Sequence, residues 1–136
     1  MLQVRGLTVH YGGIRAVKGI DLDIAAGEKV ALIGANGAGK TSTLKALARM
    51  LPAGGEVRFD GGDISHAPPH TLVGRGLALV PEGRGVFARL SVRENLDMGA
   101  YAREDRAAIA ADLDRVYTLL PRLKERAGQT AGTLSG

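Results

Sequence analysis

One stretch, VALIGANGAGKTSTLKAL at residues 30–47, constrains the fold more than any other part of the sequence. An apolar run leads into a glycine-rich loop, and an amphipathic pattern follows the loop. The loop matches G-x-x-x-x-G-K-[ST], with Gly34, Gly39, Lys40 and Thr41 at the fixed positions. Because glycine lacks a side chain, consecutive N–H groups in such a loop can turn toward one dense anion. The stretch therefore predicts an α/β fold with a phosphate-binding loop (P-loop) between a strand and a helix.

Each residue type in this loop has a predicted role toward a nucleoside triphosphate. A helix beginning near Lys40 presents its positive N-terminal end to the phosphates. The Lys40 ammonium is predicted to reach the β- and γ-phosphates, and the Thr41 hydroxyl is predicted to ligate Mg²⁺. Ser42, one residue on, is predicted to reach the α-phosphate. The loop residues expected to contact the nucleotide also include Asn36, Gly37 and Ala38.

The apolar residues indicate two kinds of strand. A period of two favours antiparallel strands with one solvated face. It occurs at Leu2/Val4, Leu7/Val9, Ile20/Leu22/Ile24 and Val57/Phe59, with an Asp60-Gly61 turn after the last pair. By contrast, residues 30–33 (VALI) and 77–80 (LALV) are unbroken apolar runs, which are typical of strands buried on both faces of a parallel sheet. The sequence thus predicts an antiparallel part and a parallel α/β part.

Three helices are predicted. The first begins near Lys40, and the second begins at Ser91, where Glu94 completes capping-box spacing. The third runs from about Glu104 to Leu120 and is ended by Pro121. The apolar face of the first comprises Leu44, Leu47, Ala48 and Leu51, and that of the third comprises Ile109, Leu113, Val116, Tyr117 and Leu120. Residues 66–70 (HAPPH) are expected to form a loop.

Composition excludes several classes of protein. The 136 residues include no cysteine, so neither a disulfide framework nor a thiolate metal site is expected. No apolar run approaches the ~18 residues of a membrane span. The net charge is +4, but the arginines are scattered, which favours a solvated basic surface and no nucleic-acid partner. A cytoplasmic protein is expected.

Four motifs in order resemble the ATP-binding subunits of ATP-binding-cassette (ABC) transporters. Tyr11 lies where that family has an aromatic residue that stacks on adenine, and Val17 lies where it has an apolar contact near the base. The phosphate loop follows, and LALVPEGRGVF then lies where the family has its Q-loop, with Glu82 in place of the usual Gln. The final TLSG is similar to the start of the L-S-G-G-Q signature, at Leu134, Ser135 and Gly136. PEGRGVFARLSVRENLDMGAY resembles the branched-chain amino acid importer group, with urea and amide importers as the alternative.

The resemblance implies the activity and the partners. Lys40 and Glu82 would be catalytic, and Thr41 and Glu82 would hold Mg²⁺. The signature residues would contact ATP bound to a second ATPase subunit in a head-to-tail dimer. Transmembrane permease subunits would dock on the region that contains Arg84, Phe87 and Arg89, and a periplasmic substrate-binding protein would act indirectly. The subunit would lie on the cytoplasmic face of the bacterial inner membrane.

The resemblance covers the N-terminal portion of one ABC ATP-binding domain. About 1–80 would form the β part and the P-loop core, and about 81–136 the Q-loop and the helical subdomain, incomplete at the C-terminus. The family's metal-binding Asp and general-base Glu would follow Gly136. The chain alone is therefore expected to bind nucleotide weakly without turnover, and to be marginally stable with exposed apolar faces. The competing interpretations are a non-transport ABC ATPase, a small nucleotide-binding module or P-loop kinase complete at 136 residues, and a truncated nucleotide-binding P-loop module without turnover.

Overall fold

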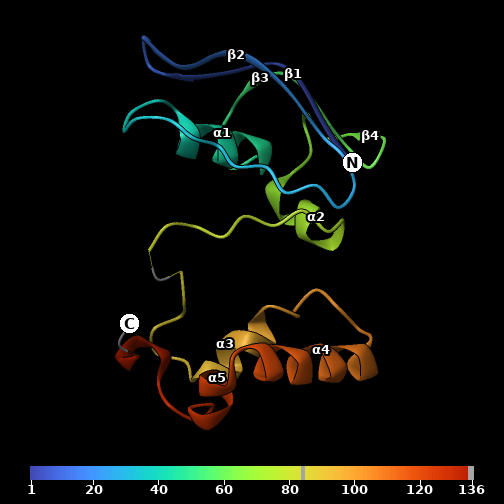
Figure 1. The fold of residues 1–136 in the computed structure, drawn as a ribbon, viewed down its shortest axis with the longest axis vertical. Coiled ribbons are helices and arrows are strands. Elements are labelled where there is room, and N and C mark those ends of the chain that lie inside the picture. The colour runs from blue at the N-terminus through green and yellow to red at the C-terminus, as the bar shows by residue number, and fades with distance from the viewer. Residues whose placement is uncertain (84, 135–136) are drawn as a thin grey trace. The chain divides into compact units, whose positions relative to one another are not determined.

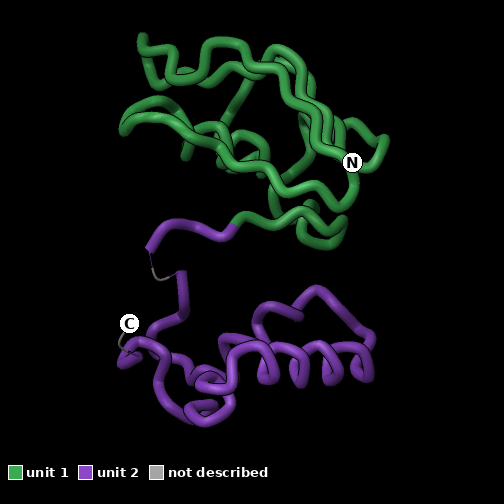
Figure 2. The backbone as a smooth tube through the Cα atoms, in the orientation of Figure 1, with its two compact units in different colours: residues 1–79 green, residues 80–136 purple. Residues whose placement is uncertain are grey.

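A computed structural model describes residues 1–83 and 85–134, which form two compact units (Figures 1 and 2). The first unit contains residues 1–79 and the second contains residues 80–136. The predicted phosphate loop belongs to the first unit. The predicted Q-loop residue Glu82 and the predicted signature belong to the second.

The first unit is built on an antiparallel sheet with the strand order β2-β1-β3-β4 in the described residues. The strands are β1 (Leu2–Tyr11), β2 (Ile14–Ile24), β3 (Gly54–Phe59) and β4 (Gly62–Asp63). Asp60 and Gly61 connect β3 to β4 with φ angles of 47° and 79°. Positive φ at both central residues is the requirement of a type I′ hairpin turn. The antiparallel part and the turn are therefore confirmed.

A bulge in β1 lets two buried residues lie three positions apart. Strict alternation would place Val4 and Leu7 on opposite faces, yet both are fully buried. The register shifts between them, where Gly6 has φ 58°. Gly55 of β3 faces the bulge with φ 90°, and a Cβ atom there would lie 2.5 Å from the carbonyl oxygens of Arg5 and Gly6. Glycine is thus required by space at Gly55 and favoured by backbone conformation at Gly6.

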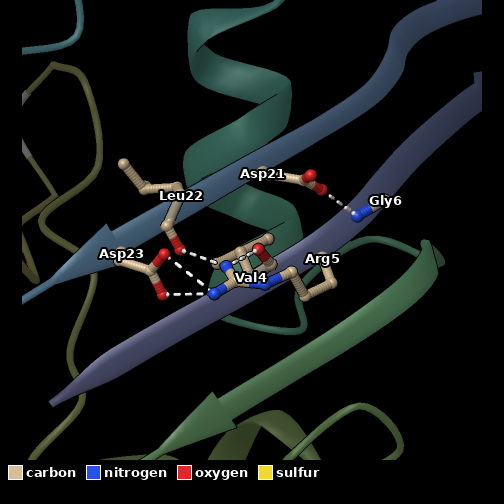
Figure 3. A network of polar contacts seen from close by, with 6 residues as sticks. All are labelled: Val4, Arg5, Gly6, Asp21, Leu22 and Asp23. Atoms are coloured by element: carbon tan, nitrogen blue, oxygen red, sulfur yellow. Dashed lines mark hydrogen bonds and ion pairs between the residues drawn. The ribbon is translucent and has the colours of Figure 1, made fainter.

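Charged side chains of β2 hold the solvent face of the bulge (Figure 3). The Gly6 N–H, which the bulge removes from the ladder, donates to the Asp21 carboxylate at 2.6 Å. The Arg5 guanidinium donates to both carboxylate oxygens of Asp23 at 2.8 Å. It also reaches the main-chain carbonyl of Leu22 in β2. These side chains therefore form hydrogen bonds with main-chain groups beside the bulge, among them the Gly6 N–H that has no partner in the strand ladder.

Two helices complete the first unit: α1 (Lys40–Leu47) and α2 (Pro69–Gly74). Helix α1 buries Thr43, Ala46 and Leu47, and it contacts β1 and β2. Leu44 is 46% exposed, so its predicted place on the buried face is wrong. The core comprises Leu2, Val4, Leu7, Val9, Val17, Ala46, Leu47, Val57, Phe59, Ile64 and Leu72. Residues 66–70 are only partly a loop, because Pro69 is the first residue of α2.

Helix α1 ends in a Schellman motif that places an arginine in the left-handed region. The Met50 N–H donates to the Lys45 carbonyl at 2.8 Å, and the Arg49 N–H donates to the Ala46 carbonyl at 3.0 Å. Arg49 has φ 58°, where glycine is the usual residue. Among the described residues its buried Nε and Nη1 atoms have no hydrogen-bond partner. The site costs roughly 1–2 kcal/mol in backbone strain alone.

The two apolar runs do not form the predicted parallel strands. Residues 28–35 and 77–81 lie outside every strand, and none of the described strands pairs with them. A β-strand requires the main chain of a neighbour, and the apolar sequence alone does not supply one. Ile33 is 90% exposed and Val80 is 89% exposed. The expected exposure of apolar side chains is therefore confirmed.

The second unit is helical in its described residues. It contains α3 (Val92–Met98), α4 (Arg106–Leu119), α5 (Pro121–Glu125) and a short 3₁₀ helix, η1 (Ala131–Thr133). The third predicted helix corresponds to α4, which begins two residues after Glu104. Tyr117 is buried as predicted, but Leu120 is 56% exposed, because it lies between α4 and α5 and outside both. Pro121 ends one helix and begins the next, and α5 was not predicted.

The predicted capping box at the start of α3 is confirmed and has a pH dependence. The Ser91 hydroxyl accepts from the Glu94 N–H, while the Glu94 carboxylate accepts from the Ser91 hydroxyl and N–H at 2.7 Å. These two donors lower the pKa of Glu94 below its ordinary 4.5, with the hydroxyl as the larger cause. A lowered pKa in the folded state stabilises the fold above pH 4.5, and this stabilisation is lost as the pH falls through the folded value.

We therefore expect Glu94→Gln, which keeps an acceptor at the cap, to reduce the acid-induced loss of stability. The measurement is the urea midpoint of the full-length protein and this variant at neutral pH and at about pH 3.5. Glu125→Gln is the control, since Glu125 lies in an exposed ion pair on another helix of the same unit. An equal acid loss in wild type and Glu94→Gln would contradict the role of the cap.

Candidate functional site

The predicted phosphate loop forms a concave run of main chain that leads into α1. Gly37 and Gly39 have φ angles of 85° and 89°, whereas Ala38 and Lys40 keep negative φ angles. Alternating signs of φ turn successive N–H groups toward one side, which makes an anion-binding nest. Gly39 is the N-cap of α1 and provides no side-chain cap. The nest therefore adjoins N–H groups of the first helical turn.

The fixed glycine at position 39 is required by the close approach of β2. A Cβ atom at Gly39 would lie 2.6 Å from the Ala16 carbonyl oxygen and 3.4 Å from Val17 Cγ2. Its left-handed φ also disfavours any residue with a side chain. Val17 is itself a core residue with 4% exposure, so its side chain packs against the loop from the side of the core. Strand β2 thus fixes the position of the nest.

Lys40 bends back over the beginning of its own loop. Its ammonium donates to the carbonyl oxygens of Gly34 at 2.7 Å and Ala35 at 2.8 Å. An ammonium has three N–H donors, so one remains after these two bonds. The Ala35 carbonyl also accepts the Ala38 N–H at 3.1 Å, which tightens the turn. The cation is therefore held at the loop, where it adds positive charge to the main-chain donors.

A cavity of about 610 Å³ lies between β2 and the loop. Its volume is in the range of small-molecule sites, roughly 300–1,000 Å³. The lining residues are Ile14, Arg15, Ala16, Val17, Lys18, Ile20, Leu32, Ile33, Gly37, Ala38, Lys40 and Thr43. Arg15 and Lys18 were not predicted for the site. The sequence signal that could have indicated them is their place in the chain, since Arg15 and Lys18 lie within a few residues of the two predicted base contacts Tyr11 and Val17.

The structure brings several of the predicted site residues of the first unit together. The Tyr11 hydroxyl lies 3.2 Å from Ser42 Oγ, although 31 positions separate the two residues. Tyr11 remains 48% exposed, so much of its ring is accessible. Asn36 and Thr41 are exposed, and Thr41 is the second residue of α1. Tyr11 and the loop thus belong to one surface region of the first unit, and the buried Val17 lies beside Gly39 of the loop.

The remaining predicted site residues belong to the second unit. Glu82 is exposed and follows Pro81, and Leu134 is half-buried after η1. Ser135, Gly136 and Arg84 lie outside the described residues. Within residues 1–83 and 85–134 no cluster of three metal-ligating side chains occurs. The Thr41 hydroxyl and the Glu82 carboxylate are hard oxygen donors, which in kind suit Mg²⁺.

Comparisons with known proteins agree with this architecture. Residues 17–136 match the ABC transporter family. The high-affinity branched-chain amino acid transport ATP-binding protein BraG of Pseudomonas aeruginosa is 42% identical over the whole chain, and the probable branched-chain amino acid transport ATP-binding protein LivF of Archaeoglobus fulgidus is 34% identical. The chain spans 58% of the length of each. A solved structure of an ATP-binding subunit of an ABC transporter superposes with a TM-score of 0.82 at 28% identity, over 99% of this chain and 56% of that one.

No helix in the described part of the chain has the length and apolar composition to cross a bilayer. The nest, the lysine held at the start of the same loop and the helix that follows are the parts expected of a phosphate site, and the family match extends from β2 to the end of the chain. On these grounds the chain belongs to the ABC transporter family.

Proposed function

We propose that this chain is the nucleotide-binding part of an ATPase subunit that drives import of branched-chain amino acids. The observation that carries the proposal is the nest at Gly37–Gly39 together with the Lys40 ammonium, which the Gly34 and Ala35 carbonyls hold at the start of the same loop. This arrangement concentrates main-chain donors and one cation where a polyphosphate would lie. The two relatives named above, both branched-chain amino acid transport proteins, support the class of substrate. A urea or amide importer of the same group is the alternative.

The proposed roles follow from where each side chain lies. The loop N–H groups bind the phosphates, and Lys40 exchanges its two carbonyl acceptors for phosphate oxygens. Magnesium, when bound, neutralises phosphate charge, and Thr41 and Glu82 are its proposed ligands. Tyr11 stacks on the base, with its hydroxyl anchored by Ser42. Val17 supports the loop beneath the base.

We further propose that the chain is the N-terminal portion of a single ATP-binding domain, with its β part and P-loop core at about 1–80. The Q-loop and helical subdomain occupy about 81–136. Its proposed partners are a second ATPase subunit, transmembrane permease subunits and, indirectly, a periplasmic substrate-binding protein. Phe87, which is 56% exposed, and Arg89, also exposed, suit a contact with a membrane subunit. The subunit would act at the cytoplasmic face of the inner membrane.

The test is transport by the full-length protein reconstituted with its membrane subunits in vesicles. We expect ATP and Mg²⁺ to drive accumulation of labelled leucine, isoleucine or valine, and removal of Mg²⁺ to abolish it. Accumulation of urea or a short amide in place of these amino acids would assign the alternative substrate class. ATP binding without any ATP-dependent uptake would reduce the function to nucleotide binding.

A further inference from the structure

Two segments of the second unit, more than thirty positions apart, are joined by main-chain hydrogen bonds. The membrane-side loop (residues 87–91) and the start of α3 form one edge, and the approach segment (residues 127–134) forms the other. The approach segment donates two of the bonds, from Gly132 N to Ala88 O at 3.0 Å and from Ala131 N to Leu90 O at 2.8 Å. The start of α3 donates the other two, from Val92 N to Gln129 O and from Arg93 N to Ala127 O, both at 2.9 Å. Ser91 and Thr130 form an antiparallel bridge at the centre. The approach segment therefore takes its position from the membrane-side loop.

The side chain of Asn95 fixes the shape of that loop. Its Oδ1 atom accepts the Phe87 N–H at 2.8 Å. Its Nδ2 atom donates to the carbonyl oxygens of Ser91 at 2.9 Å and Phe87 at 3.1 Å, and lies 3.4 Å from that of Leu90. The network sets the amide orientation, because a flipped amide would direct its oxygen toward these carbonyls. The Leu90 carbonyl also accepts the Ala131 N–H, so Asn95 acts on a group that holds the approach segment.

Gly132 allows the two segments to approach closely. A Cβ atom at this position would lie 2.8 Å from the Ala88 carbonyl oxygen and 3.0 Å from Ala88 Cβ. Its φ is not in the left-handed region, so the restriction comes from space and not from backbone conformation. Gly128, in the same segment, has nothing within 4 Å of its Cβ position. The close approach is thus specific to the position beside Ala88.

We propose that Asn95 and Gly132 are positioning residues that lock the membrane-side loop to the approach segment, so that the two move together. Because the two segments pair antiparallel, the exposed Phe87 side chain and the half-buried Leu134 lie at the same end of the locked pair, next to the bond from Gly132 to Ala88. A force applied to the loop is then passed along main-chain hydrogen bonds to the residues that precede Ser135. The consequence for transport rests on the proposed function, in which the loop contacts a membrane subunit and Leu134 begins the signature.

The first experiment measures the lock without reference to transport. Amide hydrogen exchange is followed at Phe87, Ala131 and Gly132 in the full-length protein and in Asn95→Asp. At pH 8 the carboxylate faces carbonyl oxygens, and we expect exchange at these amides to accelerate at least about tenfold relative to wild type. At about pH 5.5 the same carbonyls raise the pKa of the new carboxyl, and protonation restores a donor, so the difference from wild type should narrow. Unchanged exchange at Ala131 and Gly132 would overturn the lock.

The second experiment measures coupling in the reconstituted complex. We expect Asn95→Asp at pH 8 and Gly132→Ala to lower uptake per ATP hydrolysed by about fivefold or more, with affinity for ATP unchanged, and Gly128→Ala to behave as wild type. At about pH 5.5 we expect uptake per ATP hydrolysed by Asn95→Asp to come closer to that of wild type at the same pH. Such a recovery supports a positioning role, because a general loss of structure would not be reversed by protonation of one carboxyl group. Faster exchange with normal uptake per ATP would overturn the positioning role. A wild-type complex that hydrolyses no ATP would refute the proposed function, while the exchange result would still decide whether the lock exists.

Discussion

Replacement of Lys40 by alanine in the full-length protein should lower ATP turnover by about 10²–10³-fold, as expected when a preorganised cation is removed from a phosphate site. The side chain is held at the loop by bonds to the Gly34 and Ala35 carbonyls, so its charge is in place before a nucleotide arrives. The measurement is steady-state phosphate release with saturating ATP and Mg²⁺. Binding of a fluorescent ATP analogue is measured in parallel, because loss of two loop bonds also alters the nest.

Lys45→Ala is the matched control for this change. Lys45 lies in the last turn of the same helix, is exposed, and lines no part of the cavity. Lys45→Ala removes one positive charge from α1, as Lys40→Ala does. The two substitutions therefore reduce the general electrostatic attraction of ATP equally. We expect turnover within about twofold of wild type, as for a distant surface charge screened by salt. Equal losses in the two variants would show that net charge, and not the Lys40 geometry, accounts for the activity.

Replacement of Gly55 by alanine should destabilise the first unit by about 3–5 kcal/mol, from a left-handed backbone and an overpacked strand pair. The added Cβ would lie 2.5 Å from two main-chain oxygens of β1, and neither can move without disturbing the bulge. The two strands carry core residues, so separation at this point also loosens the apolar layer beneath α1. The measurement is urea unfolding of the full-length protein followed by circular dichroism.

Gly19→Ala separates the two contributions. Gly19 of β2 has φ 93°, almost the value at Gly55, but its Cβ position has nothing within 4 Å. We expect a loss of about 1–2 kcal/mol from backbone conformation alone. The difference between the variants then reports the contact with β1. If both lose the same free energy, the close approach of β3 to the bulge contributes nothing.

Local chemistry made part of this structure predictable. The capping box at Ser91 and the Asp60-Gly61 turn depend on neighbours within a few residues, and the antiparallel strands show in the sequence as a period of two. The phosphate loop belongs to the same class, because its glycines and Lys40 act over six positions. Arg15 and Lys18 could not be assigned in this way, since their place beside the loop depends on β2 approaching Gly39.

Other features depended on partners that a sequence pattern does not reveal. The runs at 30–33 and 77–80 are apolar enough for buried strands, yet strand formation requires a neighbouring main chain. Leu44 satisfies the helical period but lies on the exposed side of a helix that buries Ala46 and Leu47. Arg49 adopts the conformation of a C-terminal glycine because the Schellman hydrogen bonds of α1 require it. For the two apolar runs and Leu44 tertiary context overrode a local preference, whereas the conformation of Arg49 comes from hydrogen bonds at the end of its own helix.

The bulge of β1 also bears on how related sequences can diverge. Gly6 bends the strand, Asp21 accepts the N–H that the bend releases, and Gly55 leaves room for the displaced carbonyls. These residues come from three strands, and each has its structural role only while the bulge is present. A lineage that replaced Gly6 and restored regular pairing would reverse the faces of the residues on one side of it. We therefore expect Gly6, Asp21 and Gly55 to be kept together or replaced together among related sequences.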